Sequence, residues 1–396
     1  MRVFNVNLYW FSLALLSDGV FAYIPDTYIT DGGLFVKPSL EIGVVYDDNI
    51  YNEQRSGTSS VIMAVMPSVN FKMDDGINYY SLDIKAEKGI YETSDSDNYT
   101  DVELGINAHI EPNDTHRIDL SVKGEWLTES RGTGKTEADF EKTNEPILYG
   151  KNTLAAAYEY GAKQTKGRLV FDLQYFEKEY RNFDEITRRS NYDSLFLGST
   201  FYYSTRAHTD TVVEVNVQKI GYDYNAPDEF NRDSDVYTVL LGMQWEASSI
   251  LHGFIKIGAQ AKEFTDSRRD DFTGFSWNIG GMWRPLTYSQ VTFSTSQATK
   301  DPDGKGDYVL ETKFQADWRH HWATYYYTSF GVYKYKDDYS GISRVDDTYG
   351  FTLKLNYDLT QNFAIAVFGE WDKNQSTKTE FEYDKNVVGV SLTFTL

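Results

Sequence analysis

An alternation of apolar and polar residues runs along nearly the whole chain and constrains its fold more than any other feature. Near the start, Leu40, Ile42 and Val44 share one phase of the alternation, and Glu41 lies on the other. Successive side chains of a strand point to opposite faces, so this period of two predicts strands with one apolar face. The pattern recurs over residues 80–86, 102–110, 118–126, 237–245, 351–357 and 388–396. The sequence therefore predicts an all-β fold.

The connections between these segments alternate between short and long. Short turns fall near residues 74–76, 111–114, 163–167, 205–209, 246–249, 285–287, 319–322 and 358–362. Longer polar stretches cover about 47–58, 91–100, 127–148, 180–191, 222–234, 262–274, 299–307, 334–346 and 372–385. Barrels of the bacterial outer membrane have short periplasmic turns and long extracellular loops. We therefore predict a transmembrane antiparallel β-barrel of about 18 strands, within a range of 16–18.

Composition excludes several other classes of protein. The chain has no cysteine, which removes thiol catalysis, disulfides and cysteine-ligated metal centres. Its net charge of -21 argues against a nucleic-acid partner, because phosphate contacts need a basic face. A mean hydropathy of -0.51 and the lack of a long apolar run beyond the first two dozen residues argue against a helical membrane protein.

The first residues have the pattern of a targeting segment. Arg2 precedes a mostly apolar stretch from Val3 to Leu16, and small residues before position 23 suit cleavage after Ala22. We expect a signal peptide at 1–22, a short periplasmic lead at 23–35 and the outer-membrane barrel at 36–396. Export then places the chain in the outer membrane of a Gram-negative bacterium.

Aromatic residues near the predicted strand ends fit a bilayer. The tryptophans of the outward phase lie where an interfacial girdle is expected, and they are Trp126, Trp245, Trp283, Trp318 and Trp371. In a soluble protein such residues would plug the ends of a core.

The last segment favours a closed barrel. Its alternation continues through Leu392, Phe394 and Leu396, so the chain is expected to end within a strand. A closed barrel pairs this strand with the first, whereas a soluble sheet would leave an open edge. We expect Leu392, Phe394 and Leu396 to form the signal for the barrel-assembly machinery, although a terminal Phe is more usual than Leu396.

The opening of the barrel resembles a known family. Residues 35–44 read Phe-Val-Lys-Pro-Ser-Leu-Glu-Ile-Gly-Val, residues 46–51 read Tyr-Asp-Asp-Asn-Ile-Tyr, and residues 66–69 read Met-Pro-Ser-Val. This is similar to the outer-membrane porin barrels found in exopolysaccharide and capsule biosynthesis loci. The resemblance implies a pore or scaffold in the export or assembly of an envelope polysaccharide, with no catalytic residues.

Asp47, Asp48 and Asn49 form the most specific part of this resemblance. They lie where the first strand leaves the membrane. Two interpretations stay open: a cation site or loop cap, and an ordinary Asx turn.

The sequence offers few candidate catalytic or metal-binding groups. Every histidine falls in or near a predicted short turn, so a histidine base at the cell surface is not expected. The His320-His321 pair is poorly suited to one metal, because neighbouring strand residues point to opposite faces. Residues 301–307 resemble a calcium loop only faintly, since Lys305 and Thr312 stand where oxygen-rich ligands are required. No cofactor, metal site or enzymatic activity is predicted.

The predicted lumen carries charges of both signs. We expect the following residues to line it: Glu41, Asp83, Lys85, Glu103, Asp119, Lys123, Asp172, Glu214, Lys256, Lys354, Tyr202, Tyr325 and Tyr327. The charges either pair across strands or set a field in the pore. The tyrosine rings either stack on sugar faces or fill space.

The sequence favours a non-enzymatic pore or scaffold for export of an exopolysaccharide or capsular polysaccharide. A general diffusion porin is the alternative, and a surface enzyme on a barrel is the third reading. The expected partners are outer-membrane lipids and lipopolysaccharide, the barrel-assembly machinery, the polysaccharide and periplasmic export components.

Overall fold

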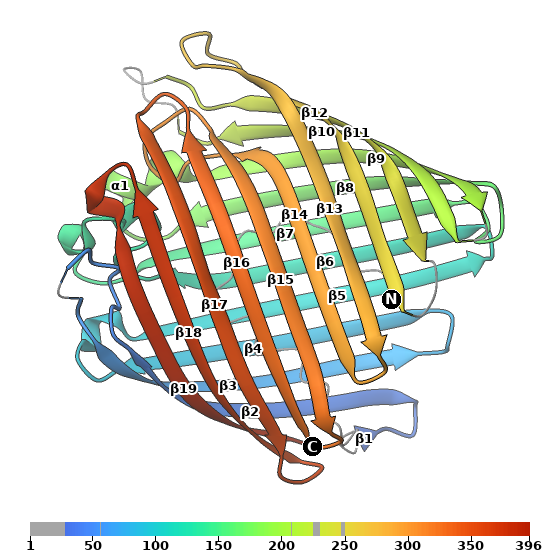
Figure 1. The fold of residues 1–396 in the computed structure, drawn as a ribbon, viewed down its shortest axis with the longest axis horizontal. Helices are drawn as coiled ribbons and strands as arrows, with labels where there is room; N and C mark the ends of the chain where they lie inside the picture. The colour runs from blue at the N-terminus through green and yellow to red at the C-terminus, as the bar shows by residue number, and fades with distance from the viewer. Residues whose placement is uncertain (1–27, 56, 207, 225–229, 247–249) are drawn as a thin grey trace.

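The chain folds into a closed antiparallel barrel, shown by a computed structural model (Figure 1). The structure describes residues 28–55, 57–206, 208–224, 230–246 and 250–396. Its sheet has 19 strands. The two-residue strand β1 (Tyr28–Ile29) pairs with the first residues of β2, and β2 to β19 form the 18-stranded wall. The predicted signal peptide at 1–22 lies outside the described residues.

Each wall strand pairs with its neighbours in chain order, and most contain 13 to 15 residues. Their bounds are β2 (Leu34–Asp47), β3 (Ser60–Asp74), β4 (Tyr79–Tyr91), β5 (Tyr99–Asn113), β6 (His116–Glu129), β7 (Ile147–Tyr160), β8 (Gly167–Tyr180), β9 (Tyr192–Arg206), β10 (Thr209–Tyr222), β11 (Ser234–Glu246), β12 (Leu251–Phe264), β13 (Phe272–Leu286), β14 (Ser289–Lys300), β15 (Val309–Ala323), β16 (Tyr326–Tyr339), β17 (Arg344–Asp358), β18 (Phe363–Ser376) and β19 (Tyr383–Thr395). The long connections add the one-turn helix α1 (Asp184–Thr187) and the 3-10 turns η2 (Asp95–Asp97), η3 (Gly134–Thr136), η4 (Phe140–Lys142), η5 (Arg188–Ser190) and η6 (Thr379–Phe381).

The barrel closes where the last strand meets the first. β19 pairs with β2 from Val387 opposite Asp47 to Thr395 opposite Ser39. Beyond β19, the amide of Leu396 donates to the carbonyl of Pro38 at 3.2 Å. Closure therefore leaves neither terminal strand with an open edge, as the sequence predicts.

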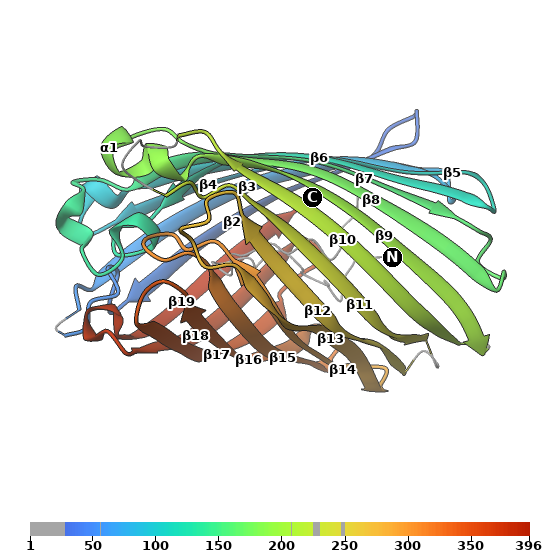
Figure 2. The ribbon, with the colours of Figure 1, turned by 90° about the horizontal axis from the view of Figure 1, so that it is seen from above.

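The alternation in connection length is also present. The long connections gather at the end of the barrel where α1 lies, which we call the long-loop end, and the other is the short-turn end (Figures 1 and 2). One predicted long connection is wrong: residues 334–346 contain only a turn at 340–343, because β16 and β17 continue to Tyr339 and from Arg344. An outward ion pair joins Lys334 to Asp347 across these strands at 3.0 Å. Where the strands extend beyond the apolar belt, their residues are polar on both faces. The sequence therefore shows no apolar–polar alternation there, and the strands could not be recognised.

Apolar side chains cover the outside of the wall. Leu197, Leu241 and Val367 are each more than half exposed, and their strand neighbours point inward. All five predicted girdle tryptophans share this outward phase, as their register shows: Trp371, for example, pairs with the exposed Phe351. Among the described residues, no helix is long and apolar enough to cross a membrane. An apolar belt on a closed sheet is the surface that a bilayer accommodates.

Buried apolar side chains gather inside the barrel at the long-loop end. One cluster consists of Ile147, Tyr149 and Tyr180, and loop residues Phe183 and Ile186 pack against it. A second cluster consists of Ile220, Tyr222 and Val236. This end of the interior is therefore packed with side chains, and it is where a functional site is best sought.

Candidate functional site

The structure places the predicted lumen residues on the inward phase of their strands, with one exception. The inward residues are Glu41, Asp83, Lys85, Glu103, Asp119, Lys123, Asp172, Glu214, Lys256, Lys354, Tyr202 and Tyr327. Tyr325 lies in the turn between β15 and β16, and its ring contacts that of the outward Tyr357 at 5.4 Å. The prediction for Tyr325 is wrong because β16 begins one residue later, at Tyr326, so strand phase does not extend to it.

Many of these lumen charges pair with one another. Lys123 contacts Glu103 at 3.0 Å and Glu125 at 2.8 Å, and Lys256 contacts Glu214 at 2.5 Å. These pairs lie within β6, between the neighbouring β5 and β6, and from β12 to β10 across β11, and they reduce the net field in the lumen.

Half-buried tyrosines lie between the paired charges. The Tyr202 ring has the Arg168 guanidinium 5.0 Å from its centre, and the Tyr335 ring has the Lys313 ammonium at 5.8 Å. Tyr333 stacks on Tyr335 at 5.2 Å. The lumen therefore offers flat apolar faces beside charged groups.

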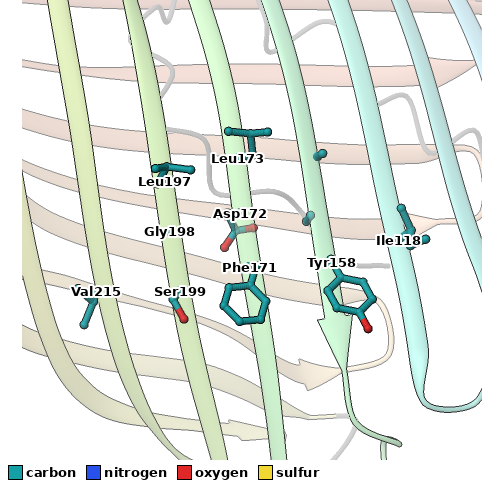
Figure 3. Close-up of a pocket in the computed structure, with 11 residues that line it drawn as sticks. Ile118, Tyr158, Phe171, Asp172, Leu173, Leu197, Gly198, Ser199 and Val215 are labelled. Carbon is teal, nitrogen blue, oxygen red and sulfur yellow. The ribbon is translucent and has the colours of Figure 1, made fainter.

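Surface hollows of the wall carry no site. The hollow in Figure 3 is lined mostly by outward residues of β6 to β10, such as Tyr158, Phe171 and Leu197, while Asp172 and Gly198 belong to the inward phase. A second hollow lies mostly over outward residues of β17, β18, β19, β2 and β3. Both are shallow gaps between side chains of the apolar belt, where lipid is expected.

The loop at 130–146 crosses the long-loop end of the barrel. It contacts its neighbours through Arg131, which pairs with Asp97, and through Phe140, whose ring stacks on Tyr51 at 4.2 Å. Its Glu137 also accepts two hydrogen bonds from Arg344 of β17, at 2.7 and 3.1 Å. Between β6–β7 and β17 lie nine strands on one side of the ring and six on the other. The loop therefore links opposite walls.

The loop at 301–308 meets it from the facing side. The Asp301 carboxylate contacts Lys262 of β12 at 2.6 Å and accepts a hydrogen bond from the Tyr222 hydroxyl at 2.9 Å. Arg232, from the loop at 223–233, donates to the carbonyl of Pro302 at 2.8 Å. Lys135 of the crossing loop donates to the carbonyl of Asp303. These contacts hold residues 301–303 inside the barrel at its long-loop end, between β12 and the crossing loop at 130–146. We call this part of the interior the mouth.

A collar of inward aromatic side chains surrounds this segment. All its members lie within three residues of the long-loop end of their strands: Tyr91, Tyr99, Tyr149, Tyr180, Tyr192, Tyr222, Phe272, Tyr339 and Tyr383. Cations sit against several of these rings, including Lys178, which is 4.8 Å from the centre of Tyr149 and 4.6 Å from that of Tyr180. Arg232 lies 4.3 Å from the centre of Tyr222. Such contacts stabilise cations in a crowded, partly dry site.

The loop carboxylates stay ionised because of this positive surrounding. Burial acts to raise the pKa of Asp301, but the charges of Lys262 and Arg232 outweigh it and hold that pKa below its usual value. Asp303 behaves in the same way, although water reaches its side chain within the mouth. The cations that lower its pKa are Lys178, Lys135, Lys300 and Arg232.

Lys135 is the titratable cation of the mouth. Burial lowers its pKa to about 8, with a further lowering from the nearby charges of Arg232 and Lys178 that the Asp303 and Glu129 carboxylates only partly oppose. It therefore keeps most of its charge at neutral pH and loses it as the pH rises through about 8.

The Asp47-Asp48-Asn49 motif fastens the barrel seam. The backbone amide of Asn49 donates a hydrogen bond to the Asp47 carboxylate at 2.9 Å, and this bond forms an Asx turn. Lys385 of β19 contacts the same carboxylate at 2.8 Å. Asp48 accepts hydrogen bonds from both the backbone and the side-chain amide of Asn386 at 2.7 and 2.8 Å. The motif thus holds β19 against β2 just beyond their last paired residues. At the other end of the same seam, Leu392 and Phe394 face outward opposite Ile42 and Leu40.

The histidines lie near the short-turn end, and one has carboxylate partners. His109 faces inward with Nδ1 at 2.6 Å from Asp119 and Nε2 at 3.1 Å from Glu111. His109 meets these carboxylates because Asp119 lies directly opposite it on β6, near the short-turn end of the strands. His320 packs on Trp322, while His321 stacks on the inward Tyr327, so this pair does point to opposite faces. Within the described ranges, no three candidate ligands gather as a metal site.

Sequence reasoning missed the cations and rings of the mouth. Lys178 and Tyr180 share the phase of Asp172, so the alternation of β8 could have placed them inside. The approach of residues 301–303 to Lys135 has no local signal, because 168 residues separate the two partners.

Comparisons with known proteins show a match to a β-barrel porin family and a similarity to solved porins. A model of the family described as "Putative beta-barrel porin 2" matches residues 28–396. No curated protein matches the sequence. Among solved structures, the chain is similar to OccK5 (OpdH) of Pseudomonas aeruginosa, with 13% identity, a TM-score of 0.46 and coverage of 91% of this chain and 98% of that one. It is also similar to a BenF-like porin from Pseudomonas fluorescens Pf-5, with 8% identity, a TM-score of 0.48 and coverage of 91% and 99%.

Proposed function

The chain belongs to the β-barrel porin family whose model matches residues 28–396, and from that premise we propose that it is a non-enzymatic pore for export of an exopolysaccharide or capsular polysaccharide across the outer membrane of a Gram-negative bacterium. A porin-type barrel supplies a water-filled path through the membrane. The identity of the transported molecule, a polysaccharide, is the part of this proposal that goes beyond the family match.

One observation carries the proposal: half-buried tyrosines with adjacent cations lie along the interior. Tyr202 with Arg168 and Tyr335 with Lys313 each combine an apolar ring face with a charged group. A sugar ring presents C–H groups on its faces and hydroxyls on its rim, so it complements such a pair. Repeated sites of this kind suit a chain that advances from one site to the next, because each contact is weak and renewed.

The proposed partners follow from the two faces of the barrel. The outward apolar belt contacts outer-membrane lipid, and acidic loop residues such as Asp95 face the outside, where divalent cations bridge them to lipopolysaccharide. The β19 strand, with Leu392 and Phe394 outward, is the segment offered to the barrel-assembly machinery. Periplasmic export components would approach the short-turn end.

A general diffusion porin is the second candidate. The self-paired charges favour it, because pairs such as Lys256 with Glu214 leave little net field to select a solute. The two candidates differ in what happens to a polymer when the pore is missing.

The test is deletion of the gene and complementation with the wild type or a Tyr202→Ala, Tyr335→Ala double variant. Export predicts that the deletion lowers polymer at the cell surface and raises it in the periplasm, and that the double variant restores it only in part. A matched variant, Tyr326→Ala, changes an outward tyrosine and is expected to restore export fully. Unchanged surface polymer in the deletion strain would contradict the proposal and leave the diffusion porin.

A further inference from the structure

We propose that the long-loop mouth contains a binding site for the carboxylate groups of an acidic polysaccharide, and that the chain's own residues Asp301 and Asp303 occupy this site until the polysaccharide displaces them. The inference rests on the proposed function and deepens it by naming the charge of the substrate.

The first support is a concentration of cations that belong to separate elements. Lys178 comes from β8, Lys262 from β12, Arg232 from the loop at 223–233, and Lys135 from the loop at 130–146. Lys262 is 1% exposed, and Lys178 is also buried. Burying ammonium groups costs free energy unless anions compensate. The mouth is therefore built to hold negative charge.

The second support is the identity of the group that supplies this charge. Glu129 of β6 supplies one buried carboxylate near Lys178 and Lys135, whereas Asp301 and Asp303 belong to a segment of a connection and not of the wall. Asp301 contacts Lys262 directly, whereas Asp303 lies among the cations with its side chain still reached by water. An external carboxylate can therefore compete first for the surroundings of Asp303 without prior unfolding of the wall.

The third support is the surface beneath the segment. The rings of Tyr149, Tyr180 and Tyr222 are nearly covered in this state, and cations lie against their faces. A uronic acid residue combines a carboxylate with an apolar sugar face, so it matches both the cations and the rings. Residues 301–303 supply only the carboxylates, and a sugar acid would add the stacking contact.

Displacement also changes the width of the path. Residues 301–303 and the crossing loop at 130–146 meet through Lys135, and they come from nearly opposite sides of the barrel. Binding of an external anion at Lys135 and Lys178 removes the attraction that holds the two loops together. A substrate that binds here thus opens the path that it will use.

The experiment uses the full-length protein in planar bilayers, with an Asp303→Asn variant and an Asp95→Asn control that removes a carboxylate from an exposed outer turn. The probes are a galacturonic acid pentamer and the neutral maltopentaose. Loss of the competing carboxylate is expected to lower the concentration of galacturonic acid pentamer that half-blocks the current by roughly fivefold, the scale of one exposed ion pair. The control is expected to behave as the wild type. A Lys178→Met variant should weaken block by the acidic pentamer and leave block by maltopentaose unchanged.

The outcomes separate this inference from the proposed function. Equal block of wild type and Asp303→Asn by the acidic pentamer would overturn the self-occupied site and leave a saccharide pore standing. A higher conductance and anion preference in Asp303→Asn, with no block by either saccharide, would support occupation by the chain's own carboxylates but contradict saccharide as the ligand. Each variant is first shown to migrate on gels in the heat-modifiable form of a folded barrel.

Discussion

The short turns and the long loops of this barrel are stabilised by different kinds of contact. In the turn between β5 and β6, Asn113 accepts hydrogen bonds from the amides of Thr115 and His116, two and three residues away. At the opposite end, Glu137 accepts from Arg344, 207 residues away. Turns are thus defined locally, whereas the mouth forms only after the wall has brought distant residues together. The difference indicates that the short-turn end is set by contacts within each turn, whereas the long-loop end, where we place the proposed site, depends on the assembled wall.

The largest effect is expected from removing residues 394–396. This deletion shortens β19 and exposes the edge of β2 that Phe394 and Thr395 cover. It also removes the hydrogen bond from the Asn362 side chain to the Thr395 carbonyl at 2.7 Å. We expect no folded barrel in the membrane fraction, measured as loss of heat-modifiable migration on gels. Normal membrane levels would show that closure does not depend on this end.

Replacing the crossing loop should separate the two ends most clearly. Exchanging residues 132–144 for a short Gly-Ser linker removes Glu137 and Phe140 from the mouth but leaves the wall intact. We expect a several-fold rise in single-channel conductance with little change in barrel assembly, because the loop crosses the path. A conductance equal to that of the wild type would mean that the narrowest point lies elsewhere in the lumen.

The wall of the barrel could be predicted from the sequence, whereas the mouth could not. The alternation of Leu40, Ile42 and Val44 predicts the strands because each side chain reports its own face. The same logic places Lys123 and Glu103 on the inward face, while the register of β5 and β6 brings them together. The loop at 301–308 shows no alternation of apolar and polar residues. Its position in the mouth depends on contacts with Lys262, Arg232 and Lys135, which only the folded wall brings close to it. Loop residues lack the repeating environment that allows a strand to be predicted from its sequence.

A smaller effect concerns pH. The lowered pKa of Lys135 means that it loses its charge as the pH rises through about 8, while Arg232 beside it stays protonated. We expect cation preference, measured as the reversal potential in a salt gradient, to increase between about pH 7 and about pH 9. Lys135→Met should show the high-pH selectivity at both values. A wild-type step that survives in Lys135→Met would assign the titration to another group.

The smallest effect should come from a single turn. Asn113→Ala removes two hydrogen bonds to backbone amides in an exposed turn. We expect a loss of about 1 kcal/mol in the free energy of unfolding, measured by tryptophan fluorescence in urea with detergent, and no change in conductance. A large change in conductance would contradict the assignment of function to the opposite end.

Single-channel recording of the wild-type protein tests the central claim most directly. The account predicts a conducting barrel whose current is blocked, reversibly and in proportion to concentration, by the galacturonic acid pentamer added to the bath. Block by the acidic pentamer is expected at lower concentration than block by maltopentaose, because the cations of the mouth add to the stacking on tyrosine. An open, stable conductance that neither saccharide alters at any concentration would contradict the account.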